Sequence, residues 1–353
     1  MTILTIIAFH EYVKKGGRMK WRKLMMFLLG GIILSAGCVI IVNQTPKVEE
    51  VQLLGTAYTD ADFATNGQFY IAVVAISEDG EVIELSKSNI TVVVDSSEPI
   101  QSYSVSVKDV TQHEITEKNV AVGLLLDSSG SMDWNDPDET RKTAAKEFIR
   151  RLYSNSSNHL AGIFDFAARY GDANNDGIDD YYFRVICDYR QVSDTVTLFS
   201  AVDSVTASGG TPLYLATKYL LQHTYNNVST TYHRALLVLT DGYDNESSPV
   251  TSDTVVNLSQ SYSIPVFGIG LGDDVDEEFP DAIRRTGGVY ANASDAEALE
   301  DIFTAMGLGL AQGYTEITLT INPIPQSGTI IYGHLNITSG GNTVTCLWIL
   351  EVQ

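Results

Sequence analysis

The stretch GLLLDSSGSMDW, residues 123–134, sets one carboxylate and three hydroxyl groups directly behind an apolar run. The four side chains belong to Asp127, Ser128, Ser129 and Ser131. Such a group could form a solvated turn, a nucleophile, a capped helix start or a cradle for a cation. Carboxylate and hydroxyl oxygens are hard ligands that suit Mg²⁺ or Mn²⁺. The elements that position these side chains therefore decide which chemistry applies.

The elements around this stretch follow an α/β pattern. From Asn119 onward, apolar runs typical of buried strands alternate with segments of helical periodicity. Strands that are apolar throughout predict a parallel sheet covered on both faces, and hence a doubly wound α/β fold. The expected strands are 120–126, 160–166, 235–240 and 265–270, and the expected helices are 138–153, 212–225, 252–262 and 295–306.

Two further segments bring candidate ligands to the same edge of this sheet. Ligands of a doubly wound sheet gather beyond the carboxyl ends of its strands. Asp127 and Asp241 each end one of the predicted strands, and Thr211 lies in a Gly-rich segment just before a predicted helix. The two carboxylates and the hydroxyls of Ser129, Ser131 and Thr211 are therefore expected to converge, which predicts a magnesium or manganese site.

Each segment also has a simpler interpretation. The residues after Asp127 could be a turn into a helix, with Asn135 or Asp136 as the N-cap. Asp241 could lie only in a turn, and Thr211 could serve only as a helix cap. The conjunction of all three segments on one α/β scaffold favours the metal site.

The three segments, taken in order as D-S-S-G-S, G-G-T-P and L-T-D-G, resemble the von Willebrand factor A (VWFA) family. The family's metal-ion-dependent adhesion site has the form D-x-S-x-S, with a later Thr and a later Asp. The resemblance spans about residues 119–310, and the matching residues are Asp127, Ser129, Ser131, Thr211 and Asp241. It implies that the hydroxyls approach the metal directly or through water, and that the Asp residues act largely through water. It also implies that an Asp or Glu of a partner protein completes the metal shell.

A second cluster of oxygen ligands lies in an insertion between the strand 160–166 and a strand expected at 181–189. The candidate calcium-loop residues are Asp172, Asn174, Asp176, Ile178 and Asp180. Their alternate spacing and the intervening Gly177 are typical of a calcium loop. Phe183 stands where an EF-hand has its bidentate Glu, so the loop looks more like the Asp-rich calcium loops of thrombospondin-type repeats. A plain Asn/Asp-Gly hairpin tip is the alternative.

Both flanks of the α/β region, residues 51–118 and 311–353, have β character. The expected strands are 69–76, 81–85, 89–94 and 102–107, and then 315–321, 329–337 and 343–352. Three C-terminal strands cannot easily form a core alone. The two flanks are therefore predicted to form one sandwich-like all-β domain, with the α/β domain at 119–310 inserted into it.

Residues 19–37 have the layout of a secretory signal, since the basic MKWRK precedes a long apolar run. The end of this segment, LSAGC, resembles a bacterial lipobox, which predicts lipidation at Cys38 and a linker over 38–50. An uncleaved apolar helix that spans the bilayer is the alternative. The preceding KKGGR could be encoded by a purine-rich run that resembles a ribosome-binding site. Translation is therefore expected to start at Met19, with residues 1–18 as a non-translated extension.

The composition agrees with an exported, folded protein. The 353 residues are 44% hydrophobic and 19% charged, which argues against disorder. The net charge of -22 disfavours nucleic acid as a partner. Only three cysteines occur, so a disulfide framework is not expected, and a single bridge between Cys187 and Cys346 is left open.

The expected function is metal-dependent protein binding or adhesion on the cell envelope, outside the cytoplasm. The alternative is a regulatory or assembly subunit of an envelope or secretion complex. An enzyme is not expected, because the sequence has no G-x-S-x-G, P-loop or H-E-x-x-H motif. A hydrolase would require a His close to Ser129 or Ser131 in the fold.

Overall fold

The structure is a computed structural model that describes residues 45–352, apart from residues 56, 60, 61, 116–118, 169–181, 273 and 294–297. The predicted signal segment with Cys38 and the predicted calcium loop lie outside the described residues. Within the described residues, no helix combines the length and the apolar character needed to cross a membrane.

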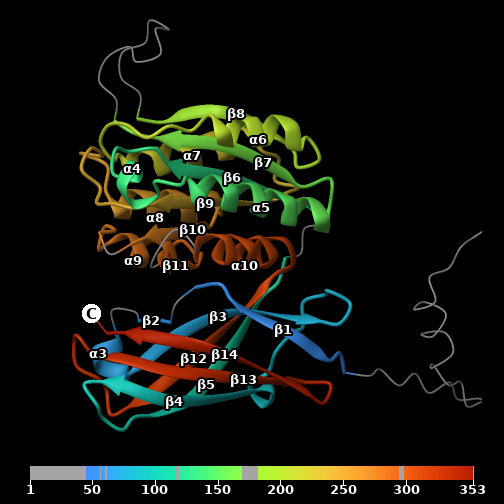
Figure 1. Ribbon diagram of the computed structural model, residues 1–353, viewed down its shortest axis with the longest axis vertical. Coiled ribbons are helices and arrows are strands. Elements are labelled where there is room, and N and C mark those ends of the chain that lie inside the picture. The colour runs from blue at the N-terminus through green and yellow to red at the C-terminus, as the bar shows by residue number, and fades with distance from the viewer. Residues whose placement is uncertain are drawn as a thin grey trace, which may run out of the picture. The chain divides into compact units, whose positions relative to one another are not determined.

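A six-stranded sheet forms the centre of the α/β domain (Figure 1). Its order is β11-β10-β9-β6-β7-β8, and its strands are β6 (Val120–Asp127), β7 (Leu160–Phe166), β8 (Arg184–Gln191), β9 (His233–Thr240), β10 (Val266–Leu271) and β11 (Tyr290–Ala293). All neighbours pair in parallel except β8, which runs antiparallel to β7. The prediction of a wholly parallel sheet is therefore wrong at this edge. The connection before β8 is rich in Asp, Asn and Gly and lacks the helical pattern that a parallel crossover uses.

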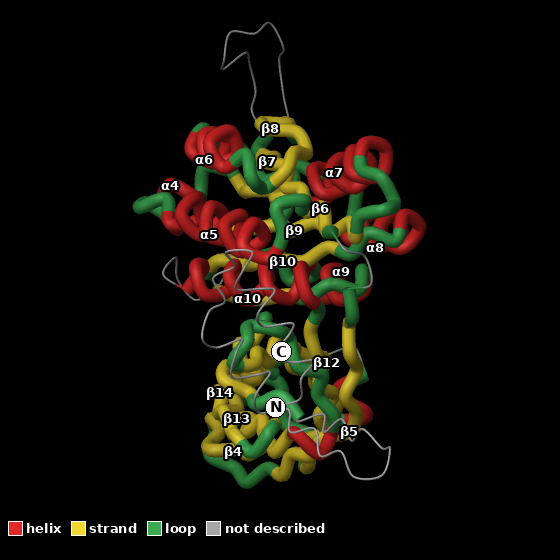
Figure 2. Tube along the Cα trace, turned by 90° about the vertical axis from the view of Figure 1, so that its right-hand side faces the viewer, coloured by secondary structure: helices red, strands yellow, loops and turns green. Residues whose placement is uncertain are grey.

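Helices cover both faces of this sheet (Figure 2). One face carries α5 (Thr140–Asn155), α6 (Thr195–Asp203) and α10 (Leu299–Gln312), and the other carries α7 (Leu213–Asn227), α8 (Ser252–Tyr262) and α9 (Phe279–Arg285). The four predicted helices are present. The short elements α6, α9 and β11 were not predicted, because their few residues give little periodicity.

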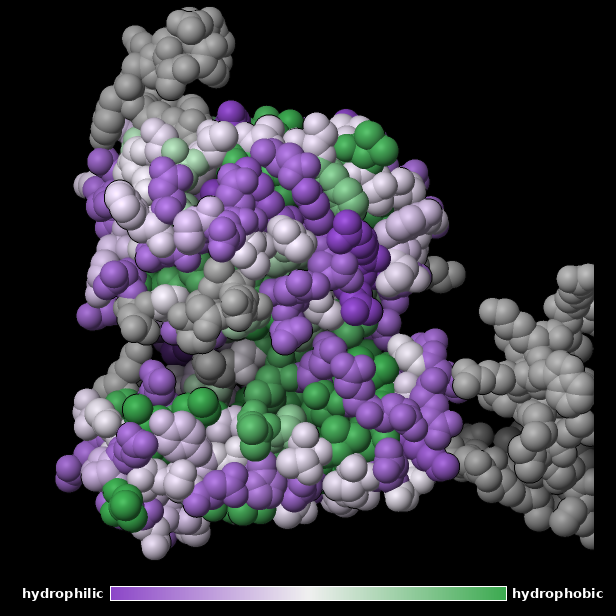
Figure 3. All heavy atoms as spheres, viewed as in Figure 1, coloured by the Kyte–Doolittle hydropathy of each residue, from purple (hydrophilic) through white to green (hydrophobic). Residues whose placement is uncertain are grey.

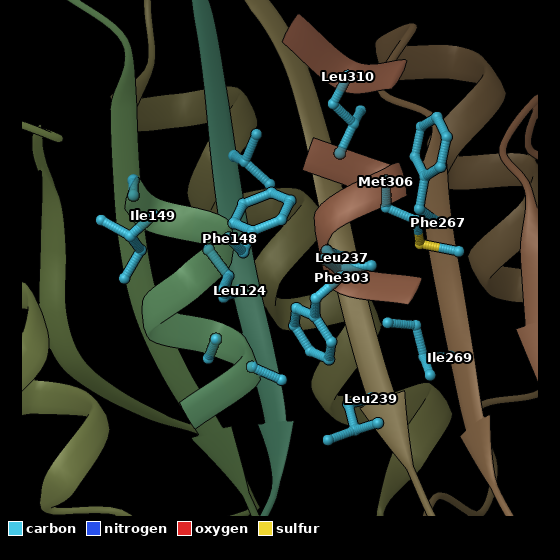
Figure 4. Close-up of a cluster of buried hydrophobic side chains, with 14 of the residues drawn as sticks. Leu124, Phe148, Ile149, Leu237, Leu239, Phe267, Ile269, Phe303, Met306 and Leu310 are labelled. Atoms are coloured by element: carbon cyan, nitrogen blue, oxygen red, sulfur yellow. The ribbon is translucent and has the colours of Figure 1, made fainter. Parts of the chain in front are cut away.

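Successive residues of each strand point to opposite helical layers. Leu124 belongs to the core cluster that contains residues of α5 and α10, whereas Leu125 packs with residues of α7. Figure 4 shows Phe148 of α5 and Phe303 of α10 over the strands, and their rings meet edge to face with centroids 6.2 Å apart. The outer sides of α5 and α6 present a mostly hydrophilic surface (Figure 3). Burial of one side of each helix thus fixes the domain around its sheet.

The flanking segments form two antiparallel sheets that share a hydrophobic core cluster. One sheet has the order β1-β3-β12-β5, with β2 beside β3, and the other has the order β14-β13-β4. The strands are β1 (Val48–Leu53), β2 (Tyr58–Thr59), β3 (Gln68–Ser77), β4 (Ile90–Glu98), β5 (Ser104–His113), β12 (Tyr314–Asn322), β13 (Ile330–Ser339) and β14 (Asn342–Glu351). The short helices α3 (Phe63–Asn66) and η1 (Lys87–Asn89) lie between strands of the first flank. The two sheets agree in part with the predicted all-β sandwich.

The C-terminal strand β12 pairs with both β3 and β5 of the N-terminal flank, so the two flanks share one sheet. The strand predicted at 81–85 is wrong, because only Val82 forms an isolated bridge, with Ile76. Cys187 and Cys346 are both free, so the disulfide that the sequence left open is not formed.

Candidate metal centre

Asp127 and Asp241 lie at the carboxyl ends of two neighbouring strands. Asp127 is the last residue of β6, and Asp241 directly follows β9. The two strands pair in parallel, with Leu126 opposite Leu239, so the two carboxylates are neighbours. Both side chains are fully buried. The sheet therefore places the pair where the sequence predicted it.

Three loops at this edge are joined to one another by backbone hydrogen bonds. The Ser208 N–H donates to the carbonyl oxygen of Ser128 at 2.7 Å, and the Gly130 N–H donates to that of Gly209 at 2.9 Å. The third loop is fixed through Asn245, whose Oδ1 accepts from the Thr211 N–H at 2.8 Å. In return, the Asn245 N–H donates to the carbonyl oxygen of Thr211 at 3.0 Å. The loops are thus held in place by the protein itself.

The predicted hydroxyl ligands converge between these loops. The Oγ atoms of Ser129 and Ser131 lie 3.1 Å apart, and Ser131 Oγ donates to Asp241 Oδ1 at 2.8 Å. A Cβ atom added to Gly242 would lie 3.8 Å from Ser131 Oγ and 3.9 Å from Thr211 Oγ1. The third hydroxyl therefore faces the same point, and Gly242 leaves room beside it.

Thr211 does not serve as a helix cap. The first amides of α7 donate to other side chains, from Tyr214 N to Asp244 Oδ1 at 3.4 Å and from Leu215 N to Ser247 Oγ at 2.9 Å. Thr211 is only 4% exposed, and within the described part of the chain its hydroxyl makes no hydrogen bond. The Thr211 hydroxyl oxygen is therefore available as a ligand for a bound cation.

The carboxylate pair lies in surroundings that disfavour its negative charge. Burial, and after it the charge of Asp241, raises the pKa of Asp127 to about 7. Burial also raises the pKa of Asp241. Such a pair gains most from a cation, which replaces the lost hydration of both groups. Because every converging side-chain atom is an oxygen, the donor set fits Mg²⁺ or Mn²⁺.

Two residues that the sequence did not indicate also hold the carboxylates. Thr240 Oγ1 donates to Asp127 Oδ2 at 2.7 Å, and Asn135 Nδ2 donates to Asp241 Oδ2 at 3.1 Å. Asn135 stands four residues after Ser131, a spacing that places both on one helical face. In the sequence, that spacing could have indicated a role of Asn135 at the metal centre. Thr240 could not be distinguished from the other residues of its buried strand.

Asp136, one of the two N-caps predicted from the sequence, lies between two helices. The short helix α4 (Met132–Asn135) ends before Asp136, whose carboxylate accepts from the backbone N–H of Thr140 at 2.6 Å and of Arg141 at 3.2 Å. The N-cap residue of α5 is Glu139, so the prediction of Asn135 or Asp136 as the N-cap is wrong. The Asp136 carboxylate still accepts from two amides at the start of α5, beside the converging oxygens.

Comparisons with known proteins place the α/β domain in a family. A model of the von Willebrand factor type A domain matches residues 121–305. An uncharacterized protein of Borreliella burgdorferi is 26% identical over 178 residues, which are 50% of this chain and 47% of that protein. The chain thus spans about half the length of this relative.

Two solved structures are among the matches of this chain. The von Willebrand factor type A protein from Catenulispora acidiphila is 13% identical, with a TM-score of 0.45 over 89% of this chain and 76% of that one. Proximal thread matrix protein 1 from the mussel byssus, solved with a zinc-occupied MIDAS motif, is 16% identical, with a TM-score of 0.42 over 59% of this chain and 49% of that one.

Proposed function

The chain belongs to the von Willebrand factor type A family, and from this premise we propose that it is a metal-dependent protein-binding module of the cell envelope. The observation that carries the proposal is the buried carboxylate pair, Asp127 and Asp241, which meets only neutral donors. Three hydroxyls converge beside the pair, and one of them, that of Thr211, makes no hydrogen bond in the described part of the chain.

The residues that would hold the ion are those that the loops bring together. The hydroxyls of Ser129, Ser131 and Thr211 supply neutral ligands, while Asp127 and Asp241 supply the charge. When bound, a magnesium or manganese ion offers a Lewis-acidic position for an Asp or Glu of a partner protein. Neutral hydroxyl ligands leave more of the ion's charge for that carboxylate. The surrounding loops would then select the partner.

Binding rather than catalysis is supported by the hydrogen bonds of the two serines. The hydroxyls of Ser129 and Ser131 bond to each other, and that of Ser131 also donates to Asp241; within the described residues no His bonds to either serine. A serine nucleophile would need such a base. The hydrolase hypothesis therefore has no supporting contact at this site.

Assembly of an envelope or secretion complex remains the second candidate function. The same site would dock a subunit of the complex instead of a host or matrix protein. The genes that neighbour this one discriminate the two hypotheses: an ATPase or secretion cluster favours assembly, and their absence favours adhesion.

Attachment to the membrane through a lipid on Cys38, or through an uncleaved N-terminal helix, is part of the proposal. It rests on the LSAGC sequence alone. Mass spectrometry of the purified protein tests it, because lipidation predicts a mature chain that begins at Cys38 with added acyl groups. A Cys38→Ser variant should keep its signal segment.

A pull-down from envelope extract of the source organism tests the function. We expect the wild-type protein to capture a partner in Mg²⁺, and we expect EDTA or Asp127→Ala to abolish capture while circular dichroism shows an intact fold. Asp301→Ala, which removes an exposed carboxylate from α10, is the matched control and should capture normally. Capture of the same proteins in EDTA and by Asp127→Ala would overturn the proposal. Repeating the assay with Mn²⁺, Zn²⁺ and Ca²⁺ identifies the metal.

A further inference from the structure

Two large aromatic side chains stand in solvent on the loops that build the metal centre. Trp134 is 83% exposed and Tyr243 is 50% exposed. Trp134 lies in α4 directly before Asn135, which bonds to Asp241, and Tyr243 follows Asp241 by two residues. Isolated exposed apolar residues are common on proteins. Two of them on two of the three site loops form a pattern that folding alone does not require.

Neither ring is used by the described part of the protein. No ring stacking or cation contact joins Trp134 or Tyr243 to another described residue. The other described tryptophan, Trp348, is 1% exposed and packs on Phe69. Trp and Tyr are the residues that most often anchor a partner at the centre of an interface. Trp134 and Tyr243 are thus available as anchors beside the metal centre.

The charge around the two rings indicates what they would hold. Three of the loops at this edge, residues 127–140, 241–251 and 271–279, contain Asp and Glu but no Lys or Arg. The exposed acidic residues among those described on them are Asp133, Asp138, Asp274, Glu277 and Glu278, together with Glu139, which pairs with Lys142. The first basic residue after the opening motif, Arg141, is buried against Asp136. These three loops would therefore repel a partner segment that carried only negative charge, except at the metal.

We propose that the partner presents a Lys or Arg close to the Asp or Glu that completes the metal shell, and that Trp134 and Tyr243 hold this basic side chain. The inference rests on the proposed function. The ring faces attract the cation, and the acidic loops favour it over a neutral or acidic residue. Metal and rings together thus select a partner segment with both signs of charge.

Labelled synthetic peptides on one Gly/Ser scaffold test the proposal with the full-length protein in detergent. The set pairs Asp with Lys at a spacing of one to four residues. Three matched peptides replace Lys by Ala, Lys by Glu, or Asp by Asn. Fluorescence anisotropy in Mg²⁺ and in EDTA gives the affinities for the wild type, Trp134→Ala and Tyr243→Ala. Tyr153→Ala, at the far end of α5, removes a ring that is 45% exposed and serves as the control.

We expect the best Asp/Lys peptide to bind about 2- to 30-fold more tightly than its Asp/Ala match, and the Asp/Glu peptide to bind most weakly. Trp134→Ala and Tyr243→Ala should each reduce this preference and leave Mg²⁺-dependent binding of the Asp/Ala peptide, while Tyr153→Ala should change nothing. Equal binding of the Asp/Lys and Asp/Ala peptides, or a preference that survives both ring substitutions, would overturn the inference. If Asp/Asn exchange or EDTA has no effect, the metal-dependent function fails instead, and the Lys preference is still measured. Binding of none of the peptides would count against both.

Discussion

Asp136 and Asp127 are both buried carboxylates of one α/β domain, yet their charges meet different surroundings. Asp136 faces the guanidinium of Arg141 at 2.6 Å, with both side chains at most 2% exposed. Asp165 likewise forms two hydrogen bonds with Arg184, at 2.9 and 2.6 Å. Asp127, in contrast, accepts from the Ser129 backbone N–H and from the Thr240 hydroxyl, and it forms no ion pair with a described basic residue.

The partners of these carboxylates distinguish those with a structural role from those of a binding site. Where a carboxylate has a structural role, the chain supplies the counter-charge from its own arginines. At the ends of β6 and β9 it supplies hydroxyls and one amide, and it leaves two neighbouring carboxylates without a basic partner. A buried charge is tolerated only when it is paired or neutralised. The second region is therefore complete only with an external cation.

The largest effect is expected when the structural pair is broken. Arg141→Met leaves the buried Asp136 carboxylate without its cation, and we expect the free energy of unfolding to fall by about 3–5 kcal/mol. Urea denaturation followed by circular dichroism measures the loss. Arg285→Met removes an arginine from an exposed pair with Asp253 and should have little effect. A small loss of unfolding free energy in Arg141→Met would show that the Asp136 carboxylate does not depend on Arg141 for its charge.

Removal of a carboxylate charge from the metal centre should leave the free energy of unfolding in EDTA unchanged or raise it. In EDTA, Asp127→Asn relieves the repulsion between Asp127 and Asp241, so the variant should be at least as stable as the wild type. Saturating Mg²⁺ should stabilise only the wild type, by about 2.7 kcal/mol at a hundredfold excess over its dissociation constant. Urea denaturation with and without Mg²⁺ measures both quantities. If Asp127→Asn loses stability in EDTA as Arg141→Met does, the Asp127 carboxylate has a structural role like that of Asp136.

A smaller effect is expected at the residues that orient the carboxylates. Thr240→Val and Asn135→Ala each remove one hydrogen bond to Asp127 or Asp241, and we expect the Mg²⁺ affinity to fall about 10- to 100-fold. Isothermal titration calorimetry measures it. Thr217→Val removes a buried hydroxyl from α7, where it bonds only to the Leu213 carbonyl oxygen, and should keep wild-type affinity. Equal affinities in all three variants would limit the site to the five residues of the motif.

The converging side chains could be predicted from the sequence because parallel strands end at one edge of their sheet. Asp127 and Asp241 directly follow strong apolar runs, so an error of one or two residues in a strand boundary does not move them from that edge. Thr240 was beyond such reasoning. Its role depends on a hydrogen bond to Asp127, across 113 positions of the chain, and nothing local to Thr240 marks it.

Strands whose place depends on a distant partner were predicted less well. β1 was not predicted as a strand, and its first three residues fall in the predicted linker 38–50. Glu49 and Glu50 interrupt its apolar pattern, but β1 lies at the edge of its sheet, where charges are tolerated. Segment 81–85 alternates like a strand, yet it finds a partner only at Val82. The direction of β8 also had to come from the structure, because alternation does not distinguish parallel from antiparallel neighbours.

His159 is a buried group that stays uncharged, and its substitution should have the smallest effect on stability. The residue is 1% exposed. Its Nδ1 accepts from the backbone N–H of Val120 at 3.1 Å, and its Nε2 lies 2.7 Å from Asn155 Oδ1. Protonation of Nδ1 would abolish the first hydrogen bond and bury a charge without a counter-ion. Burial accordingly lowers the pKa of His159 in the folded protein.

The unfolded protein, in which a His has a pKa of about 6.5, therefore takes up this proton at higher pH than the folded protein does. The stability that His159 contributes is present above that pH and is lost as the pH falls towards the lower pKa of the folded state. His159→Gln, which keeps an acceptor for the Val120 N–H, should reduce the loss of unfolding free energy between pH 7.5 and pH 5.5. His334→Gln on β13 should not reduce it. An unchanged loss in His159→Gln would show that the imidazole is protonated in the fold without cost, and that burial in this domain does not by itself forbid a charge.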